Sequence, residues 1–79
     1  MNELLDLYEE ILMEKAYKSA LLETEGHTER FFKEEAYVRG LWVSIRILGK
    51  YQEYREFAES PEGRELYREY KEDFLKKMA

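Results

Sequence analysis

The chain has no cysteine and only one histidine, His27. Disulfides and thiolate metal sites are therefore excluded, and one imidazole cannot supply a histidine-rich metal site. These absences matter because the 79 residues form one small domain, and such a domain buries only about 60% of the surface that its unfolded chain exposes. Disulfides, a metal or oligomerisation usually reinforce a domain of this size. Oligomerisation, together with unusually good helix packing, is what remains here.

Asparagine and glutamine are also scarce, with one residue of each, and aspartate occurs twice against sixteen glutamates. Charged residues make up 39% of the chain. Few Asn, Gln and Cys combined with many Glu, Lys and Arg are typical of heat-adapted proteins, so we expect a thermophilic source. The better helix propensity of Glu over Asp explains part of the same pattern.

Long apolar runs are absent as well. The longest stretch without a charge, GLWVSI, is far short of the roughly 20 apolar residues that span a bilayer. The first residues, MNELLDLYEE, are acidic where a signal peptide is basic. The net charge of −5 lies within residues 1–25, whereas the rest of the chain is balanced. We therefore expect a soluble, cytoplasmic protein that neither binds nucleic acid by bulk charge nor enters a membrane.

Arrangements typical of catalysis are absent too. The sequence contains no readable Ser/His/Asp arrangement and no glycine-rich phosphate loop. Its glutamates are too many and too evenly spread to nominate a catalytic pair. His27 follows Glu23 by four residues, but a helix end is expected at Gly26, and two ligands cannot close a metal site. We therefore expect no enzyme, no catalytic residue, no cofactor and no metal.

The few breaks in the chain, EGHT at 25–28 and SPEG at 60–63, leave three helical segments. The apolar residues of the first segment recur at three- and four-residue steps, and Lys15 falls within their stripe. We expect the Lys15 stem to line the core edge with its ammonium in water. The sequence predicts helices over 2–24, 28–58 and 61–78. The predicted fold is all-α, a three-helix antiparallel bundle or hairpin whose long central helix is mostly buried and which homodimerisation completes.

The segment YVRGLWVSIRILGKY, residues 37–51, allows two interpretations. VSIRI alternates between apolar and polar residues, which is typical of a strand. A lone strand between two helices has no partner within this chain, however, and good helix formers flank the segment on both sides. We therefore favour a helix over a strand. Such a helix is apolar around most of its circumference, which predicts burial on several sides.

Ala36, Gly40 and Ser44 are small residues four apart, so they lie one above another on a helix. Small residues in this register let a second helix approach closely. Two flanking helices cannot cover the whole apolar arc of the middle helix, so we expect its spare face to pair with a second copy in a symmetric dimer. The predicted interface consists of Ala36, Gly40, Trp42, Ser44, Ile47 and Tyr51.

Arg39, Trp42 and Arg46, with Lys50 nearby, suggest an anion or nucleotide site, because guanidinium groups bind phosphate and carboxylate and an indole stacks on a base. The simpler interpretation is a row of ion pairs in which Trp42 anchors an interface. That row would contain Glu35, Arg39, Arg46 and Glu53.

The first segment also carries an acidic face, made of Glu3, Asp6, Glu9, Glu10 and Glu14. Our leading hypothesis is a helical protein–protein interaction module that self-associates and binds or inhibits another protein. A second hypothesis assigns the acidic face to an inhibitor that occupies the basic surface of a nucleic-acid-binding or defence enzyme, in the manner of small phage inhibitors. A third is the nucleotide or anion binder described above.

Overall fold

The computed structural model describes residues 2–78, and within that range it contains helices and no strand. The helices are α1 (Glu3–Thr24), α2 (Glu29–Ile47), α3 (Tyr51–Glu59) and α4 (Pro61–Met78). The all-α class that the sequence predicts is confirmed. The strand alternative for the VSIRI segment is wrong, because residues 43–47 belong to α2.

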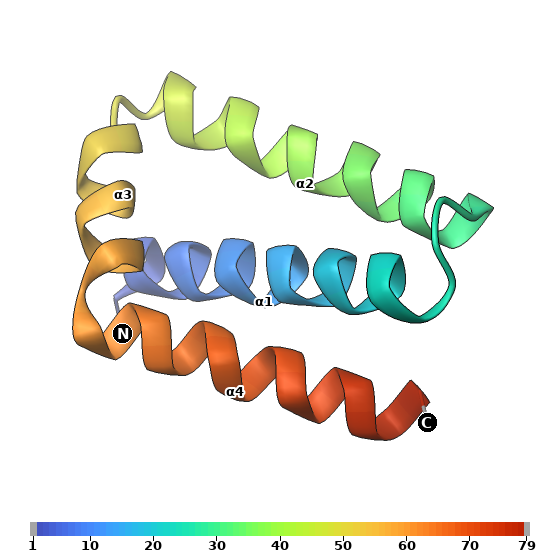
Figure 1. The fold of residues 1–79 in the computed structure, drawn as a ribbon. Helices are drawn as coiled ribbons and strands as arrows, with labels where there is room; N and C mark the ends of the chain where they lie inside the picture. Colours follow the sequence, from blue (N-terminus) through green and yellow to red (C-terminus); the bar gives the residue numbers. More distant parts are fainter. Residues whose placement is uncertain (1, 79) are drawn as a thin grey trace.

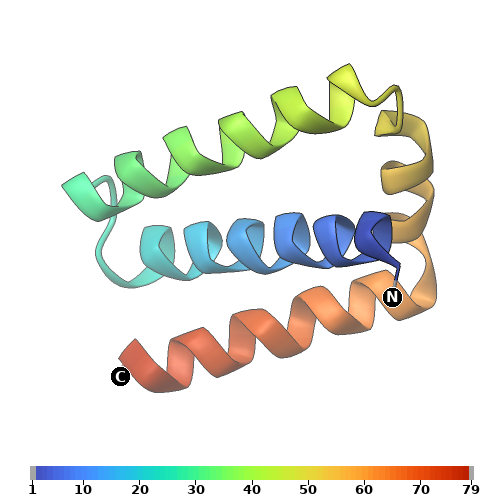
Figure 2. The ribbon, with the colours of Figure 1, turned by 180° about the vertical axis from the view of Figure 1, so that it is seen from behind.

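Three of the helices form one layer in which α1 lies between α2 and α4 (Figure 1). Helix α2 runs antiparallel to α1, whereas α4 runs parallel to it (Figures 1 and 2). The short helix α3 crosses the end of the layer and carries the chain past the N-terminus of α1. Within residues 2–78, no Cα atom of α2 comes within 8 Å of a Cα atom of α4. Helix α1 therefore separates the two outer helices, and both pack against it.

This order corrects the expectation that the middle segment is the buried central helix. The side chains with no exposure at all include Ile11, Ala16, Ala20 and Leu21 of α1. Ile11 and Ala20 point to opposite sides of the helix, because each residue turns the chain by about 100°. A helix flanked on two sides needs apolar residues on both. On the second side of α1 these apolar residues are the small Ala16 and Ala20. A search for a stripe of large apolar residues does not reveal that side.

The long helix expected over 28–58 is divided in two. Gly49 has a φ of +68°, a left-handed conformation that glycine adopts without steric cost. Its N–H donates to the Arg46 carbonyl at 3.0 Å, and the Lys50 N–H donates to the Ile45 carbonyl at 3.1 Å. This pair of hydrogen bonds is a Schellman motif, which satisfies the last carbonyls and ends α2. The chain then turns, and α3 begins at Tyr51.

The core is centred where α3 packs against α1 and α2. Tyr54 of α3 is 2% exposed and meets the Tyr8 ring edge-on, with 5.7 Å between the ring centroids. Trp42 of α2 packs perpendicular to Tyr54 at 5.1 Å. Such edge-to-face pairs each add about 0.5–1.5 kcal/mol beyond the area that they bury. Aromatic rings from three helices therefore hold α3 across the end of the layer.

Ser60 and Gly63 join α3 to α4. The Ser60 hydroxyl donates to the Phe57 carbonyl at 2.6 Å and accepts from the Gly63 N–H at 3.1 Å. Gly63 is buried, and a Cβ atom placed on it would lie 2.1 Å from the Phe57 carbonyl oxygen. The backbones of α3 and α4 approach so closely here that only glycine fits. This contact sets the sharp angle between the two helices.

Gly63→Ala is expected to lower the free energy of unfolding by about 2–3 kcal/mol, because the methyl group meets rigid backbone that cannot move aside. Urea denaturation monitored by circular dichroism measures the change. Gly40→Ala is the matched control. Nothing lies within 4 Å of a Cβ atom at Gly40, so the exchange should stabilise the chain by up to about 1 kcal/mol through helix propensity. Equal stability of the two variants would contradict the close approach at Gly63.

Candidate interaction surface

Helix α2 is apolar on two opposite sides. The side that packs on α1 buries Phe31, Val38 and Ile45, which recur every seven residues. The other side, which we call the outer α2 face, consists of Phe32, Ala36, Gly40, Val43, Ser44 and Ile47. All six are exposed, and their three- and four-residue steps place them on one side of the helix. The chain thus gives α2 a second apolar face without covering it.

Exposed apolar side chains are concentrated around this face. Of the eight large hydrophobic residues exposed within residues 2–78, six lie between residues 32 and 51. Ile47 is 80% exposed and Phe32 53%. Single exposed apolar residues are normal on protein surfaces, but a contiguous patch marks an interaction site. Leu48 and Tyr51, just past the end of α2, are exposed as well.

The series Ala36, Gly40 and Ser44 is open to the outside. No atom of another side chain or helix lies within 4 Å of a Cβ atom built on Gly40. The Ser44 hydroxyl donates to the Gly40 carbonyl at 3.2 Å, so it is satisfied within its own helix. The close helix contact that the sequence suggests is therefore not made within residues 2–78. The outer α2 face keeps a shallow, small-residue centre flanked by larger apolar side chains.

Three charges beside this face lack partners, whereas Lys33, on the same side of α2, pairs with Glu29 at 3.4 Å. Glu35, Arg39 and Arg46 make no ion pair within residues 2–78, whereas Lys50 pairs with Glu53 at 3.3 Å. Of the four charges expected to form ion pairs along this side, Glu53 alone has a partner within residues 2–78, and that partner is Lys50. Arg39 and Arg46 are exposed and hold their positive charge at the border of the apolar surface.

Trp42 does not belong to the outer α2 face. Its half-buried ring packs on Tyr51, with 5.5 Å between the ring centroids, and on Tyr54. The cation over the indole is Lys15 of α1, whose Nζ lies 5.4 Å from the ring centroid. The indole thus has a cationic neighbour on α1, and its grouping with Arg39 and Arg46 stays a hypothesis. The lysine, expected to hold its ammonium in water, lies partly buried against that ring.

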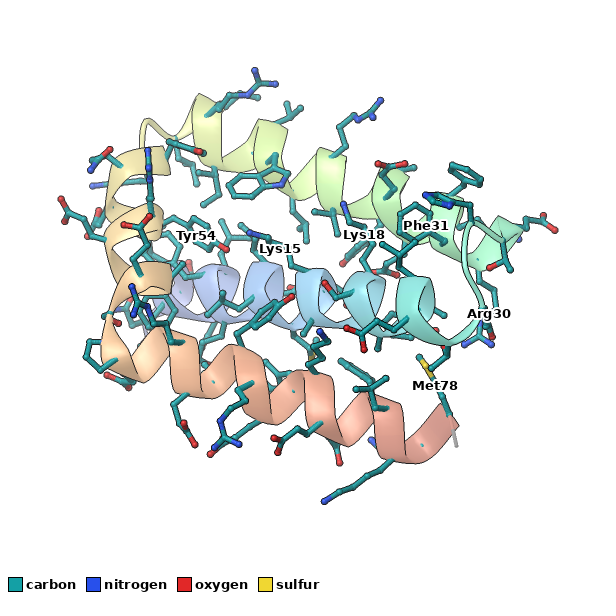
Figure 3. The ribbon with its side chains drawn as sticks, in the orientation of Figure 1. Lys15, Lys18, Arg30, Phe31, Tyr54 and Met78 are labelled. Atoms are coloured by element: carbon teal, nitrogen blue, oxygen red, sulfur yellow. The ribbon has the colours of Figure 1, made fainter. Side chains whose placement is uncertain are left out.

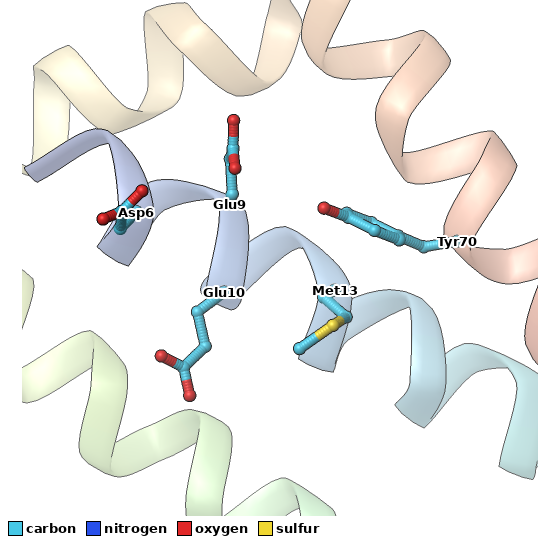
Figure 4. Close-up of a pocket in the computed structure, with 5 residues that line it drawn as sticks. All are labelled: Asp6, Glu9, Glu10, Met13 and Tyr70. Carbon is cyan, nitrogen blue, oxygen red and sulfur yellow. The ribbon is translucent and has the colours of Figure 1, made fainter. Parts of the chain in front are cut away.

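The acidic face of α1 is divided by the fold. Asp6, Glu9 and Glu10 line a hollow of about 220 Å³ together with Met13 and with Tyr70 of α4 (Figure 4). In Figure 4 the Tyr70 ring extends from α4 toward this part of α1. Burial raises the pKa of the Tyr70 hydroxyl, and the nearby carboxylates of Glu9 and Glu69 raise it further. Three of the five acidic residues therefore share one site with an apolar wall.

The other two members of that face lie elsewhere. Glu3 lines a separate hollow with Leu4, Leu7 and Leu48. Glu14 lies against Glu34 of α2, a residue that the sequence reasoning did not single out. No pattern in the sequence marks Glu34, because the carboxyl groups of Glu14 and Glu34 meet only when α1 and α2 pack together.

Burial of Glu34 at the contact between α1 and α2 raises its pKa to about 8, and the neighbouring Glu14 contributes. One carboxylate oxygen of Glu34 is buried and finds no donor within residues 2–78 when both carboxyl groups are ionised. When protonated, the Glu34 carboxyl group can donate a hydrogen bond to the neighbouring Glu14 carboxylate. Lys18 opposes the shift. Beside this pair, the Tyr37 hydroxyl donates to Glu10 at 2.6 Å, which also ties α2 to α1.

No protein-family model, curated protein or solved structure matches this chain. Among residues 2–78, no helix combines the length and the apolar character needed to cross a bilayer. The same range holds no cluster of three or more His, Cys, Asp or Glu side chains arranged for a metal ion.

Glu34→Gln is expected to change how stability depends on pH. The folded chain keeps a proton on Glu34 up to about pH 8, whereas the unfolded chain releases it near the ordinary value of 4.5. Stability is therefore lost as the pH rises through this window. The neutral amide should remove that loss and raise the Tm by about 5 °C at pH 9, with little effect at pH 4. Thermal unfolding at both pH values measures it.

Glu29→Gln is the matched control, because Glu29 is an exposed glutamate of the same helix that pairs with Lys33 in solvent. This control should show no such pH window. Parallel pH profiles of Glu34→Gln and the wild type would contradict a raised pKa at Glu34.

Proposed function

We propose that this protein is a small non-enzymatic interaction module that self-associates through the outer α2 face and acts by binding another protein. The observation that carries the proposal is the exposed apolar face opposite the buried side of α2. Leaving these side chains in water forgoes about 25 cal/mol for each Å² of apolar surface. A second copy of the chain presents the same apolar strip and buries both at once.

The shape of the face suits a symmetric pair. Ala36 and Gly40 leave its centre shallow, and nothing lies within 4 Å of a Cβ atom at Gly40. Two such helices can approach until their backbones nearly touch, while Phe32, Val43 and Ile47 pack around the contact. A two-fold axis through the centre of the face relates each residue of one copy to the same residue of the other. Two-fold symmetry is the commonest among homo-oligomers.

The flanking charges favour an antiparallel pair. Residues 35 and 46 lie at equal distances from a midpoint between residues 40 and 41. An antiparallel arrangement about that midpoint therefore brings Glu35 level with Arg46 of the second copy on the same flank. Both charges lack a partner within residues 2–78 of their own chain. Opposite charges at matched levels set orientation more than affinity.

Gly40→Leu is expected to weaken self-association at least about tenfold, because the new side chain holds the two backbones apart. Ile47→Lys should weaken it about 30-fold, as expected for a buried apolar anchor. Sedimentation velocity over a micromolar concentration series measures the dimer constant. The isolated fold should survive both changes, since Ile47 is 80% exposed and the space around Gly40 is open.

Leu22→Lys provides the control for the apolar-to-charged change, because Leu22 is 43% exposed but lies on α1. It should leave the dimer constant unchanged. The orientation is tested by charge reversal: Glu35→Arg and Arg46→Glu should each weaken the dimer, and the double variant should recover. A wild-type chain that stays monomeric while folded would defeat the proposal.

The acidic hollow supports a second candidate function, that of an inhibitor that captures a basic protein surface. Asp6 and Glu9 supply charge, while Met13 and Tyr70 supply an apolar wall along which the stem of an arginine or lysine side chain can lie. A hollow of about 220 Å³ suits one such side chain rather than an extended nucleic acid. An enzyme that binds nucleic acid would offer basic residues of this kind.

The wild-type chain is expected to bind an arginine-rich peptide, and the double variant Asp6→Lys with Glu9→Lys should lose this binding. Rising salt should weaken the wild-type complex. Neither residue makes a side-chain hydrogen bond or ion pair within residues 2–78, so the fold should persist. Glu56→Lys with Glu62→Lys is the control of equal charge change outside the hollow. Fluorescence anisotropy of the labelled peptide reads the affinity. Equal weakening by both double variants would leave only bulk charge as the cause.

A further inference from the structure

Lys15 is a partly buried cation without an anionic partner. Its side chain leaves α1 beside Tyr54 (Figure 3), and its ammonium makes no ion pair or side-chain hydrogen bond within residues 2–78. Burial lowers the pKa of the Lys15 ammonium, and the nearby Lys18 lowers it further. Burying a charge costs free energy unless a partner compensates it. The Trp42 ring supplies only a weak partner, at 5.4 Å from Nζ.

Lys15 also lines a hollow among α1, α3 and α4. The hollow has a volume of about 310 Å³, and its walls are Leu12, Lys15, Ala58, Glu59, Arg64 and Tyr67. Leu12 and Ala58 make part of the wall apolar. The Tyr67 hydroxyl is held by Ser19 at 2.8 Å, which fixes the ring in place. The hollow is therefore built from ordered side chains on three helices.

The charges around the hollow are unequal. Arg64 of α4 makes no ion pair within residues 2–78, so its guanidinium is free to bind a ligand. Glu59 is the one acidic residue in the wall, and its carboxylate is engaged by Arg55 at 3.2 Å. The hollow is thus lined by two cations without ion-pair partners and by one carboxylate that already has one. The electrostatic preference of the hollow is for an anion.

We propose that this hollow binds a small organic acid, with the carboxylate or phosphate group held by Lys15 and Arg64 and the apolar body lying on Leu12, Ala58 and Tyr67. Arg64 offers a planar fork that matches either anion, and Lys15 offers a point charge. The volume of about 310 Å³ lies at the lower end of the range for small-molecule sites. A single aromatic ring bearing an acidic group fits within it. The proposal is independent of the outer α2 face.

The test uses the full chain with benzoate and phenyl phosphate, which distinguish a carboxylate from a phosphate ligand, and with benzyl alcohol as the neutral comparison. Titrations at constant ionic strength are followed by the amide NMR shifts of Leu12, Ala58 and Tyr67. At least one of the two acids should bind saturably, and benzyl alcohol should bind much more weakly. Lys15→Met and Arg64→Gln should each raise the Kd of that acid about tenfold, as expected for loss of a charge-assisted contact.

Arg68→Gln and Lys33→Met are the matched controls, because both residues are exposed cations outside the hollow that pair with carboxylates of their own helices. They should leave the Kd unchanged. Circular dichroism verifies that Lys15→Met folds; removing a partly buried charge while keeping the stem should not destabilise it. The proposal is overturned if neither acid binds saturably, if benzyl alcohol binds as well as the acids, or if both hollow variants bind like the wild type.

Discussion

The burial of α1 between α2 and α4 determines what every other part of the chain can do. Because the outer helices do not meet, each has only α1 and the short α3 to pack against, and each turns one side to solvent. Helix α4 fills its exposed side with charges: Arg68 pairs with Glu65 and with Glu72, and Lys77 pairs with Asp73. Helix α2 instead fills its exposed side with apolar and small residues. Both outer helices pack on α1, but they differ in what they present to solvent.

The same layer creates a hollow where α4 meets α1 and another where α3 joins them. Tyr70 of α4 leans over the acidic residues of α1, whereas Tyr67 and Arg64 of the same helix face Lys15. Helix α4 therefore contributes to two sites of opposite charge. Both hollows are lined by side chains that helices carry. Where α2 packs on α1, Glu34 meets Glu14, and burial raises the pKa of Glu34.

Local features of the sequence predicted local features of the structure well. Asn2 accepts a hydrogen bond from the Leu5 N–H at 3.1 Å, and Thr28 accepts one from the Phe31 N–H at 3.4 Å, so each residue caps a helix start, the position that its residue type favours. Gly49 was harder to interpret, because strong helix formers follow it directly. A glycine at this position can kink a helix or end it. The outcome depends on whether residues 51–59 are more stable packed across the core or as an extension of α2. Tyr54 and Phe57, which pack around Tyr8, decide that balance.

The sequence by itself determined the helical class, the capped helix starts and the presence of excess apolar surface in residues 37–51. Capping, helix propensity and apolar spacing act between residues a few positions apart, so they can be read along the chain. Only the tertiary structure decided that α1 is the central helix, that Trp42 faces Lys15, and that Gly40 and Ile47 lie on an uncovered side. Both α1 and α2 carry apolar residues on more than one side, so composition does not choose between them. In the folded chain α1 takes the central place: α2 and α4 pack on its two sides, and Ala16 and Ala20 are buried on the side opposite Ile11, whereas the small residues of α2 stay open.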